Sequence, residues 1–277
     1  MPIQLHAAAL TDRGRQRTIN EDTVYQRVIS ASDEDATGLF IAADGVGGQL
    51  AGEIASYWAV ETIKDSLTDL FVPRDPRDTL RLRREELVNP DATKLLDRNN
   101  LAFRIEATVQ RANRAVRDAS ASRERPGEAG KSGTTLSMAL VQGKRAVIAN
   151  VGDSRTYLLR GGQLRQITKD HSLIQRLIDA GQAQDKERYT HPQRNLIYRS
   201  LGAKEEVEVD IFPLTLKSGD YLLLCTDGLW EMVRDPATIV AILQGACPMD
   251  EACGKLVAAA NEAGGEDNIG VVAVRVS

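Results

Sequence analysis

Short runs of aliphatic and β-branched residues recur along the chain, and polar or glycine-containing segments separate them. Runs of this length and composition are typical of buried β-strands. We expect such strands at 38–43, 135–141, 146–151, 221–226 and 269–276. Helical patterns alternate unevenly with these runs, so the sequence predicts a protein of mixed α and β structure.

Two long helices are predicted in the first half of the chain, because apolar residues recur there every three or four positions. Residues 52–70 place one apolar face along about five turns, with Trp58 on that face. Residues 101–119 repeat the pattern behind Asn99 and Asn100, which are candidate N-caps.

Two shorter helical patterns follow near the C-terminus. Asp235 and Pro236 have the residue types of an N-cap and of the first helical position. Residues 250–263 form the last helical pattern, and Gly264 and Gly265 directly after it are typical helix-stop residues.

Two polar stretches lie outside these patterns. Residues 73–98 are dense in charge and contain prolines, and residues 122–133 are polar and glycine-containing. Such stretches are typical of solvated excursions from a core. We therefore expect residues 1–277 to form one domain with a helix-bearing insertion at about 168–202.

Composition and charge restrict the class of protein. Of 277 residues, 42% are hydrophobic and 27% are charged, and the net charge is −4. This balance is ordinary for a soluble globular protein and indicates neither nucleic acid nor an anionic membrane as the main partner. Three cysteines without a C-x-x-C spacing favour neither a disulfide framework nor a structural zinc site. The chain shows no secretory signal and no membrane span, so we expect a cytoplasmic protein.

Four aspartates stand next to the most apolar strands. Asp44 follows the run 39–43, and Asp153 follows 147–152. Asp227 follows 222–226, and Asp267 lies just before the last run, 269–276. Each alone is typical of a turn. Together, at one sheet edge, they would repel one another unless cations were bound. Because every candidate ligand is an oxygen, the pattern favours Mg²⁺ or Mn²⁺ over zinc, while Ca²⁺ stays open on ligand type.

Two neighbouring features gain meaning from such a cluster. The glycines from Gly45 to Gly48 form either a plain strand-to-helix turn or backbone that lets a cation and an anionic substrate approach. Arg17, close to Glu21 and Asp22, is either part of a surface ion pair or a bidentate partner for a phosphoryl group.

An ordered set of motifs over nearly the whole chain resembles the bacterial form of the metal-dependent serine/threonine phosphatases of the 2C type. The motifs are TDRGRQRTINEDT, FIAADGVGG, AGEIAS, SGTTL, NVGDSR, DHSL, HPQRNLIYRSLG, LLLCTDGLW and GGEDNIGVV. The resemblance implies an α+β fold, a four-layer α-β-β-α sandwich with two central antiparallel sheets. It also implies a flap at 168–202 and metals in a cleft at one edge.

The resemblance further implies the metal ligands. Asp44 would bridge two Mn²⁺ or Mg²⁺ ions, the carbonyl of Gly45 would bind one, and Asp227 and Asp267 would bind the other. Glu21 and Asp22 match acids beside the same metals, acting directly or through water.

Other positions match the family's substrate site and a third, weaker metal. Arg17 would hold the substrate phosphate. Asp153 would help Asp227 hold the third ion, and Glu231 occupies an acid position near it. With the third site filled, the protein would carry three ions instead of two.

The implied reaction is direct hydrolysis of phosphoserine and phosphothreonine by water activated between two metals, without a phosphoenzyme. In many eukaryotic members a histidine follows the bridging aspartate and is proposed as the acid for the leaving group, whereas this chain has Val46. We expect a metal-bound water to serve as the acid, and structural roles for His171 and His191. The flap arginines Arg188, Arg194 and Arg199 are interpreted as solvated surface residues, with contact to acidic or phosphorylated peptides as the alternative.

The expected partners are phosphorylated proteins and a cognate serine/threonine kinase, and we expect a monomer. Two rival functions remain open from the sequence. One is a catalytically silent, metal-binding regulatory module of the same fold. The other is a phosphatase for small phosphomonoesters.

Overall fold

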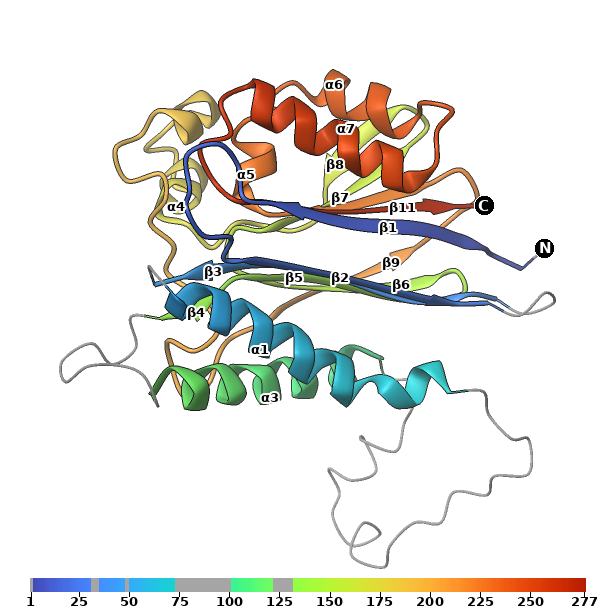
Figure 1. Ribbon diagram of the computed structural model, residues 1–277, viewed down its shortest axis with the longest axis horizontal. Coiled ribbons are helices and arrows are strands. Elements are labelled where there is room, and N and C mark those ends of the chain that lie inside the picture. The colour runs from blue at the N-terminus through green and yellow to red at the C-terminus, as the bar shows by residue number, and fades with distance from the viewer. Residues whose placement is uncertain (1, 31–34, 48–49, 73–100, 122–131) are drawn as a thin grey trace, which may run out of the picture.

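The computed structural model describes residues 2–30, 35–47, 50–72, 101–121 and 132–277. Two antiparallel sheets lie face to face in it (Figure 1). The first sheet has the order β1 (Leu5–Asp12), β11 (Ile269–Val276), β10 (Tyr221–Cys225), β7 (Arg155–Arg160) and β8 (Gln163–Gln166). The second has the order β2 (Asp22–Ile29), β3 (Thr37–Val46), β5 (Leu136–Gln142), β6 (Arg145–Val151) and β9 (Asp210–Thr215). A short strand, β4 (Gly133–Thr134), pairs with the end of β3.

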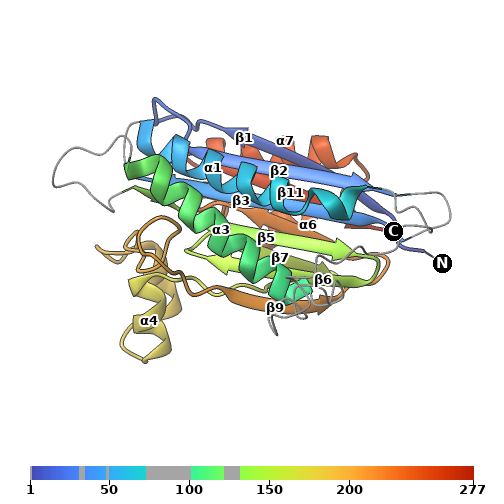
Figure 2. The same cartoon turned by 90° about the horizontal axis from the view of Figure 1, so that it is seen from below.

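Helices cover the outer face of each sheet. The second sheet is covered by α1 (Leu50–Ser66) and α3 (Leu101–Ala121) (Figure 2). The 3-10 helix η1 (Thr68–Phe71) follows α1 in the chain. The first sheet is covered by α5 (Asp227–Trp230), α6 (Pro236–Leu243) and α7 (Met249–Glu262). The remaining helices, α4 (Leu173–Asp179) and the 3-10 helix η2 (Asp185–Tyr189), lie within residues 168–202, the flap segment.

Strand periodicity explains the layers. Successive side chains of a strand point to opposite faces. On β3, Leu39 and Ile41 pack in the core beneath α1 and α3, whereas Phe40 and Ala42 pack in the core between the sheets. A third core lies between the first sheet and helices α5 to α7. The predicted four-layer α-β-β-α arrangement is therefore confirmed. Within the described ranges, none of the helices combines the length and apolarity needed to cross a bilayer.

The five predicted strands are present. Besides the two-residue strand β4, five strands of the described residues were missed. Four of these, β1, β8, β2 and β9, are the edges of the two sheets. Edge strands bury only part of their side chains, so they lack the continuous apolar run of an interior strand. Positions of β8 alternate between exposed and intermediate, and most positions of β2 are intermediate. The fifth, β7, is buried but begins and ends with arginine.

The predicted helices are present with one difference in extent, whereas α5 and η2 were not predicted. The first helix ends at Ser66 and a 3-10 turn follows, and Trp58 is 46% exposed instead of buried. Asp235 caps α6 as predicted, because its side chain accepts a hydrogen bond of 3.0 Å from the Ala237 amide. The candidate caps Asn99 and Asn100 and the charged segment 73–98 lie outside the described residues.

The turn that was expected directly after Asp44 begins later. Gly45 and Val46 still belong to β3, because β4 pairs with them in antiparallel register. The chain leaves the extended conformation at Gly47, whose φ is +143°. Gly48 lies outside the described residues.

Candidate active site

The acidic residues picked out from strand ends meet at one edge of the sandwich. Asp22 begins β2 and lies directly opposite Asp44 in the antiparallel register of β2 and β3. Asp227 begins α5 directly beyond β10, and Asp267 precedes β11. Asp153 lies in the turn between β6 and β7, which belong to different sheets. Strands of both sheets thus deliver carboxylates to the same end of the molecule.

The pKa values of these carboxyl groups show how close they are. Burial and the charge of Asp227 raise the pKa of Asp44 well above its ordinary value. Burial and the charge of Asp153 do the same for the pKa of Asp227. Burial raises the pKa of Asp22 and the pKa of Asp153 to about 7 each. Burial is thus the main reason that each carboxyl group resists ionisation, and the charges of neighbouring acids add to it.

Two polar residues that were not predicted hold the acids in place. Thr226 donates a hydrogen bond of 2.7 Å from its hydroxyl to Asp22 Oδ2, and the same hydroxyl accepts from the Gly270 amide. Asn268 accepts from the Glu21 amide at 2.8 Å and donates to the carbonyls of Arg13 and Ile19. Each stands beside a predicted acid in the sequence, so a polar residue flanking a strand-end aspartate was the available signal.

Backbone packing around Glu21 depends on two glycines. A Cβ placed on Gly45 would lie 2.1 Å from the Gly52 carbonyl oxygen, and one on Gly52 would lie 2.4 Å from Glu21 Oε1. The second glycine was not singled out from the sequence. The two glycines therefore let the first turn of α1 approach β3 and Glu21 closely.

The site has the donor set of a hard-cation site. Glu21 Oε1 and Asp22 Oδ1 are buried and have no hydrogen-bond partner. Buried carboxylate oxygens without partners are unfavourable unless a cation or a proton is near. The candidate metal ligands at this edge are all oxygen atoms, which suit Mg²⁺ or Mn²⁺. The residues present therefore fit the predicted metals chemically.

Arg17 lies against the cluster. Its Nη2 is 2.6 Å from Asp267 Oδ2, and the Arg17 side chain is 49% exposed. Asp267 Oδ1 accepts a hydrogen bond of 2.8 Å from the Asn268 amide. Among the described residues, the acids as they stand do not bring three acidic, histidine or cysteine side chains to the mutual spacing of an ion's ligands.

Both flap histidines accept a hydrogen bond from a backbone amide. His171 is buried, its Nδ1 accepts a hydrogen bond of 3.0 Å from the Gly152 amide, and its Nε2 lies 3.2 Å from Asp210. His191 Nδ1 accepts from the Gln193 amide. Val46 is 40% exposed and carries no ionisable group.

The flap arginines are not solvated surface residues, so that interpretation was wrong. Arg188 is buried, and Arg199 contacts Glu208, Asp210 and His171. Arg194 Nε lies 3.5 Å from Glu231 Oε2, which joins the flap segment to the end of α5. Each guanidinium has acceptors within the protein, and a sequence pattern does not show these because they come from distant positions.

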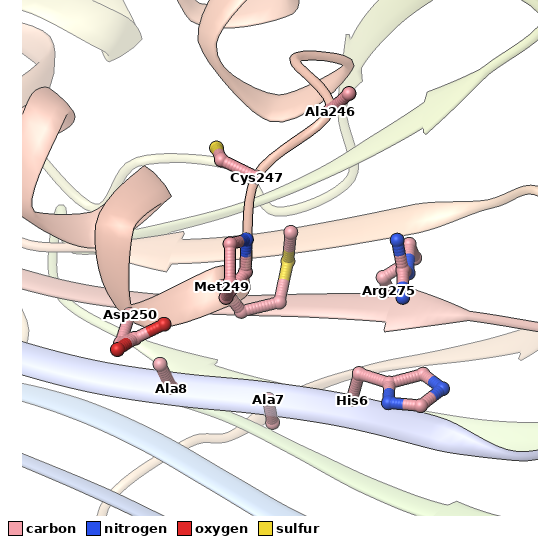
Figure 3. A pocket seen from close by; sticks show the side chains of 9 residues that line it. His6, Ala7, Ala8, Ala246, Cys247, Met249, Asp250 and Arg275 are labelled. Carbon is pink, nitrogen blue, oxygen red and sulfur yellow. The ribbon is translucent and has the colours of Figure 1, made fainter.

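A surface pocket of about 630 Å³ lies away from the acids (Figure 3). Its lining includes His6 on β1, Arg275 on β11 and Met249 at the start of α7. His6 and Arg275 pair in register, whereas the acidic edge adjoins the opposite end of these strands, where Asp12 pairs with Ile269. Six residues of strand separate the two ends by about 20 Å. None of the predicted site residues lines this pocket.

The family model of protein phosphatase 2C matches residues 13–261. Among curated proteins, "Serine/threonine phosphatase stp" of Listeria innocua is 35% identical over 98% of this chain and 95% of its own length. "Protein phosphatase PhpP" of Streptococcus pneumoniae is 35% identical over 99% of this chain and 98% of its own length. The chain therefore belongs to the protein phosphatase 2C family.

Solved structures agree in fold. The serine/threonine phosphatase PstP/Ppp of Mycobacterium tuberculosis has a TM-score of 0.75 and 34% identity, with 98% of each chain covered. The catalytic domain of PstP in complex with two manganese ions has a TM-score of 0.76 and 32% identity, with 99% of each chain covered. The predicted mixed α and β fold and the family resemblance are confirmed.

Proposed function

We propose that this chain is a metal-dependent protein phosphatase that hydrolyses phosphoserine and phosphothreonine in proteins. The carrying observation is the gathering of carboxylates with raised pKa values at one sandwich edge, with Arg17 beside them. Such a cluster is poorly stable without cations, and an adjacent guanidinium suits a phosphoryl group. Membership of the family and the names of the relatives support the same activity.

We propose Asp44, the Gly45 carbonyl, Asp227 and Asp267 as the residues that hold two Mn²⁺ or Mg²⁺ ions. Glu21 and Asp22 would act beside them, directly or through water. The unpartnered oxygens of Glu21 and Asp22 support this assignment. So does the solved PstP structure with two manganese ions.

Asp153 is proposed for a third ion shared with Asp227. The supporting observation is that the charge of Asp153 is the largest electrostatic cause of the raised Asp227 pKa. A cation between the two carboxylates would remove that repulsion.

In the proposed mechanism the ions, when bound, lower the pKa of water and offset charge on the phosphoryl oxygens. Arg17 offers two parallel N–H groups to two phosphoryl oxygens, and its half-exposed side chain is accessible to a protein-borne phosphate. For this to happen its guanidinium must leave or share Asp267 Oδ2. Thr226 keeps Asp22 oriented, and Asn268 fixes the loop that carries Glu21. Since Val46 cannot donate a proton, water is proposed to protonate the leaving alkoxide.

The test compares wild type with Asp227→Asn on p-nitrophenyl phosphate and on a phosphothreonine peptide, with Mn²⁺ or with EDTA. We expect activity only with the metal, and a loss of at least about 100-fold in the variant. Asp235→Asn is the matched control, because Asn caps α6 as well as Asp does. Metal-independent turnover or a fully active Asp227→Asn would overturn the proposal.

Two further comparisons separate the rival functions. Absence of turnover on every phosphopeptide would favour a silent regulatory module. Faster hydrolysis of small phosphomonoesters than of phosphoproteins would favour a metabolite phosphatase. A cognate kinase, a monomeric state and a cytoplasmic location stay predictions, which co-purification, light scattering and fractionation would test.

A further inference from the structure

One buried arginine of the flap segment has no part in the mechanism above. Arg188, in η2, has a side chain that is only 10% exposed. Its Nη1 donates to Asp170 Oδ2 at 3.0 Å, and its Nη2 donates to Gln175 Oε1 and Asp185 Oδ1 at 2.9 Å each. One guanidinium therefore joins the chain before α4, α4 itself and η2.

The main partner of Arg188 is already neutralised by another arginine. The Asp170 carboxylate is 1% exposed and accepts three hydrogen bonds from Arg155, at 2.6 to 3.2 Å. Arg155 and Asp170 thus form a complete buried ion pair, and removing Arg188 leaves no unpaired buried charge. Asp185, the other acid on Arg188, has an 80% exposed side chain and can turn to water. Loss of Arg188 should therefore loosen the flap segment without disrupting the core.

The Arg155–Asp170 pair connects this contact to the acidic edge. The Arg155 guanidinium stacks 3.5 Å from the centre of the Trp230 ring, and Trp230 Nε1 donates to the Asp153 carbonyl. Trp230 ends α5, the helix that Asp227 begins. The ring of Tyr189, next to Arg188 in sequence, also packs on Trp230, with 6.4 Å between the ring centres.

The flap segment borders the same edge at its other end. Leu201 pairs with Thr134 through two backbone hydrogen bonds, and Thr134 pairs with Gly45. Backbone pairing thus joins the end of the flap segment to the strand residues directly after Asp44.

We propose that Arg188 is a positioning residue that fixes the flap segment against α5 and so sets the fit of phosphoprotein substrates. The inference rests on the proposed function. Lysine would not replace Arg188, because three acceptors in different directions need the fork of a guanidinium. A small phosphomonoester needs no contact with the flap segment, so its turnover does not depend on this residue.

The first experiment is independent of activity and uses hydrogen exchange of the Mn²⁺-loaded protein. In Arg188→Met we expect the amides of 173–199 to exchange about tenfold faster, because hydrogen bonds to charged groups are lost, while β5 and β6 keep their rates. Lys186→Met is the matched control, since Lys186 is an exposed cation of the same short helix η2. Unchanged exchange in Arg188→Met would overturn the proposal.

The second experiment compares KM and kcat on a phosphoprotein and on p-nitrophenyl phosphate. We expect Arg188→Met to raise KM for the phosphoprotein several-fold with kcat on p-nitrophenyl phosphate unchanged, and Arg188→Lys to behave like Arg188→Met. An equal loss on both substrates, or full rescue by lysine, would contradict the positioning role. If wild type hydrolyses neither substrate, the proposed function fails, and hydrogen exchange still decides whether Arg188 anchors the flap segment.

Discussion

Arg17 donates a hydrogen bond to Asp267 at the acidic edge. Arg17 is proposed to bind the substrate phosphate, and Asp267 is proposed to bind a metal ion. The contact has two opposite consequences. It keeps the guanidinium close to where a phosphate is proposed to bind, and it places a positive charge beside a cation site. Arg17 is therefore expected to assist phosphate binding and to oppose metal binding.

The variant Arg17→Met should separate these effects. We expect kcat/KM to fall by about 100- to 1000-fold, as for the loss of one donor to a transition-state oxygen. We expect Mn²⁺ affinity without substrate, measured by titration calorimetry, to stay equal or to increase, because a repelling charge is removed. Arg13→Met, which removes another exposed arginine of the same loop, should change neither quantity. Weaker Mn²⁺ binding in Arg17→Met would show that the guanidinium supports the metal site.

At the residue level, sequence reasoning succeeded where chemistry and position coincide. Asp44 and Asp227 were found because each follows a strongly apolar run of the sequence. Thr226 was not found, because its position beside Asp227 does not show which group its hydroxyl bonds, and that group, Asp22, is 204 positions away in sequence. Arg188 was misplaced for the same reason, since Asp170 and Gln175 become its partners only when α4 and η2 fold together.

At the level of elements, the distinction is between interior and edge strands. All five predicted strands have partner strands on both sides, namely β3, β5, β6, β10 and β11. Their side chains are buried on both faces, so composition alone identifies them. Edge strands β1, β2, β8 and β9 share burial with solvent, and their pairing is determined by the sheet they join. The order of the strands was therefore not predicted, and the family resemblance implied only two antiparallel sheets in four layers.

The base of the flap segment gives an element whose stability depends on pH. His171 is buried between Gly152, Asp210 and Arg199, and burial lowers its pKa from the ordinary 6.5. Arg199 further disfavours the charged imidazole, whereas Asp210 and Asp170 favour it. Because the folded state binds this proton less tightly than the unfolded state does, the stability from neutral His171 is complete above 6.5 and is lost as the pH falls below it.

Thermal denaturation of the Mn²⁺-loaded protein between about pH 8 and pH 5 measures this contribution. Wild type should lose melting temperature over the lower half of that range, and His171→Gln should show a flatter curve. His6→Gln is the control, since His6 is exposed on β1 and its Nε2 lies 3.2 Å from the Ser277 hydroxyl. Parallel curves for wild type and His171→Gln would contradict a lowered pKa at this position.

At the scale of the whole molecule, the acidic edge is where carboxyl groups from the two sheets meet. Asp22 and Asp44 come from the second sheet, and Asp227 and Asp267 flank strands of the first. Thr226 links the sheets here through its bond to Asp22. Charge repulsion at this edge therefore opposes the packing of the sandwich itself, and cations that neutralise it should stabilise the entire fold.

The free energy of unfolding is therefore expected to depend on pH at this edge without metal, and bound metal is expected to remove this dependence. The pKa values of Asp22 and Asp153 are raised to about 7. Without metal, the folded state holds these protons more tightly than the unfolded chain, so stability is complete below about pH 4 and falls as the pH rises towards 7.

In EDTA the melting temperature should thus decrease from about pH 5 to pH 7.5, and saturating Mn²⁺ should remove the decrease. Asp22→Asn should flatten the EDTA curve because it removes one of the ionising groups, whereas the cap control Asp235→Asn should leave it unchanged. A melting temperature in EDTA that rises steadily up to pH 7.5 in wild type would mean that the carboxylates ionise without opposing the fold, and the electrostatic case for a cation site at this edge would be lost.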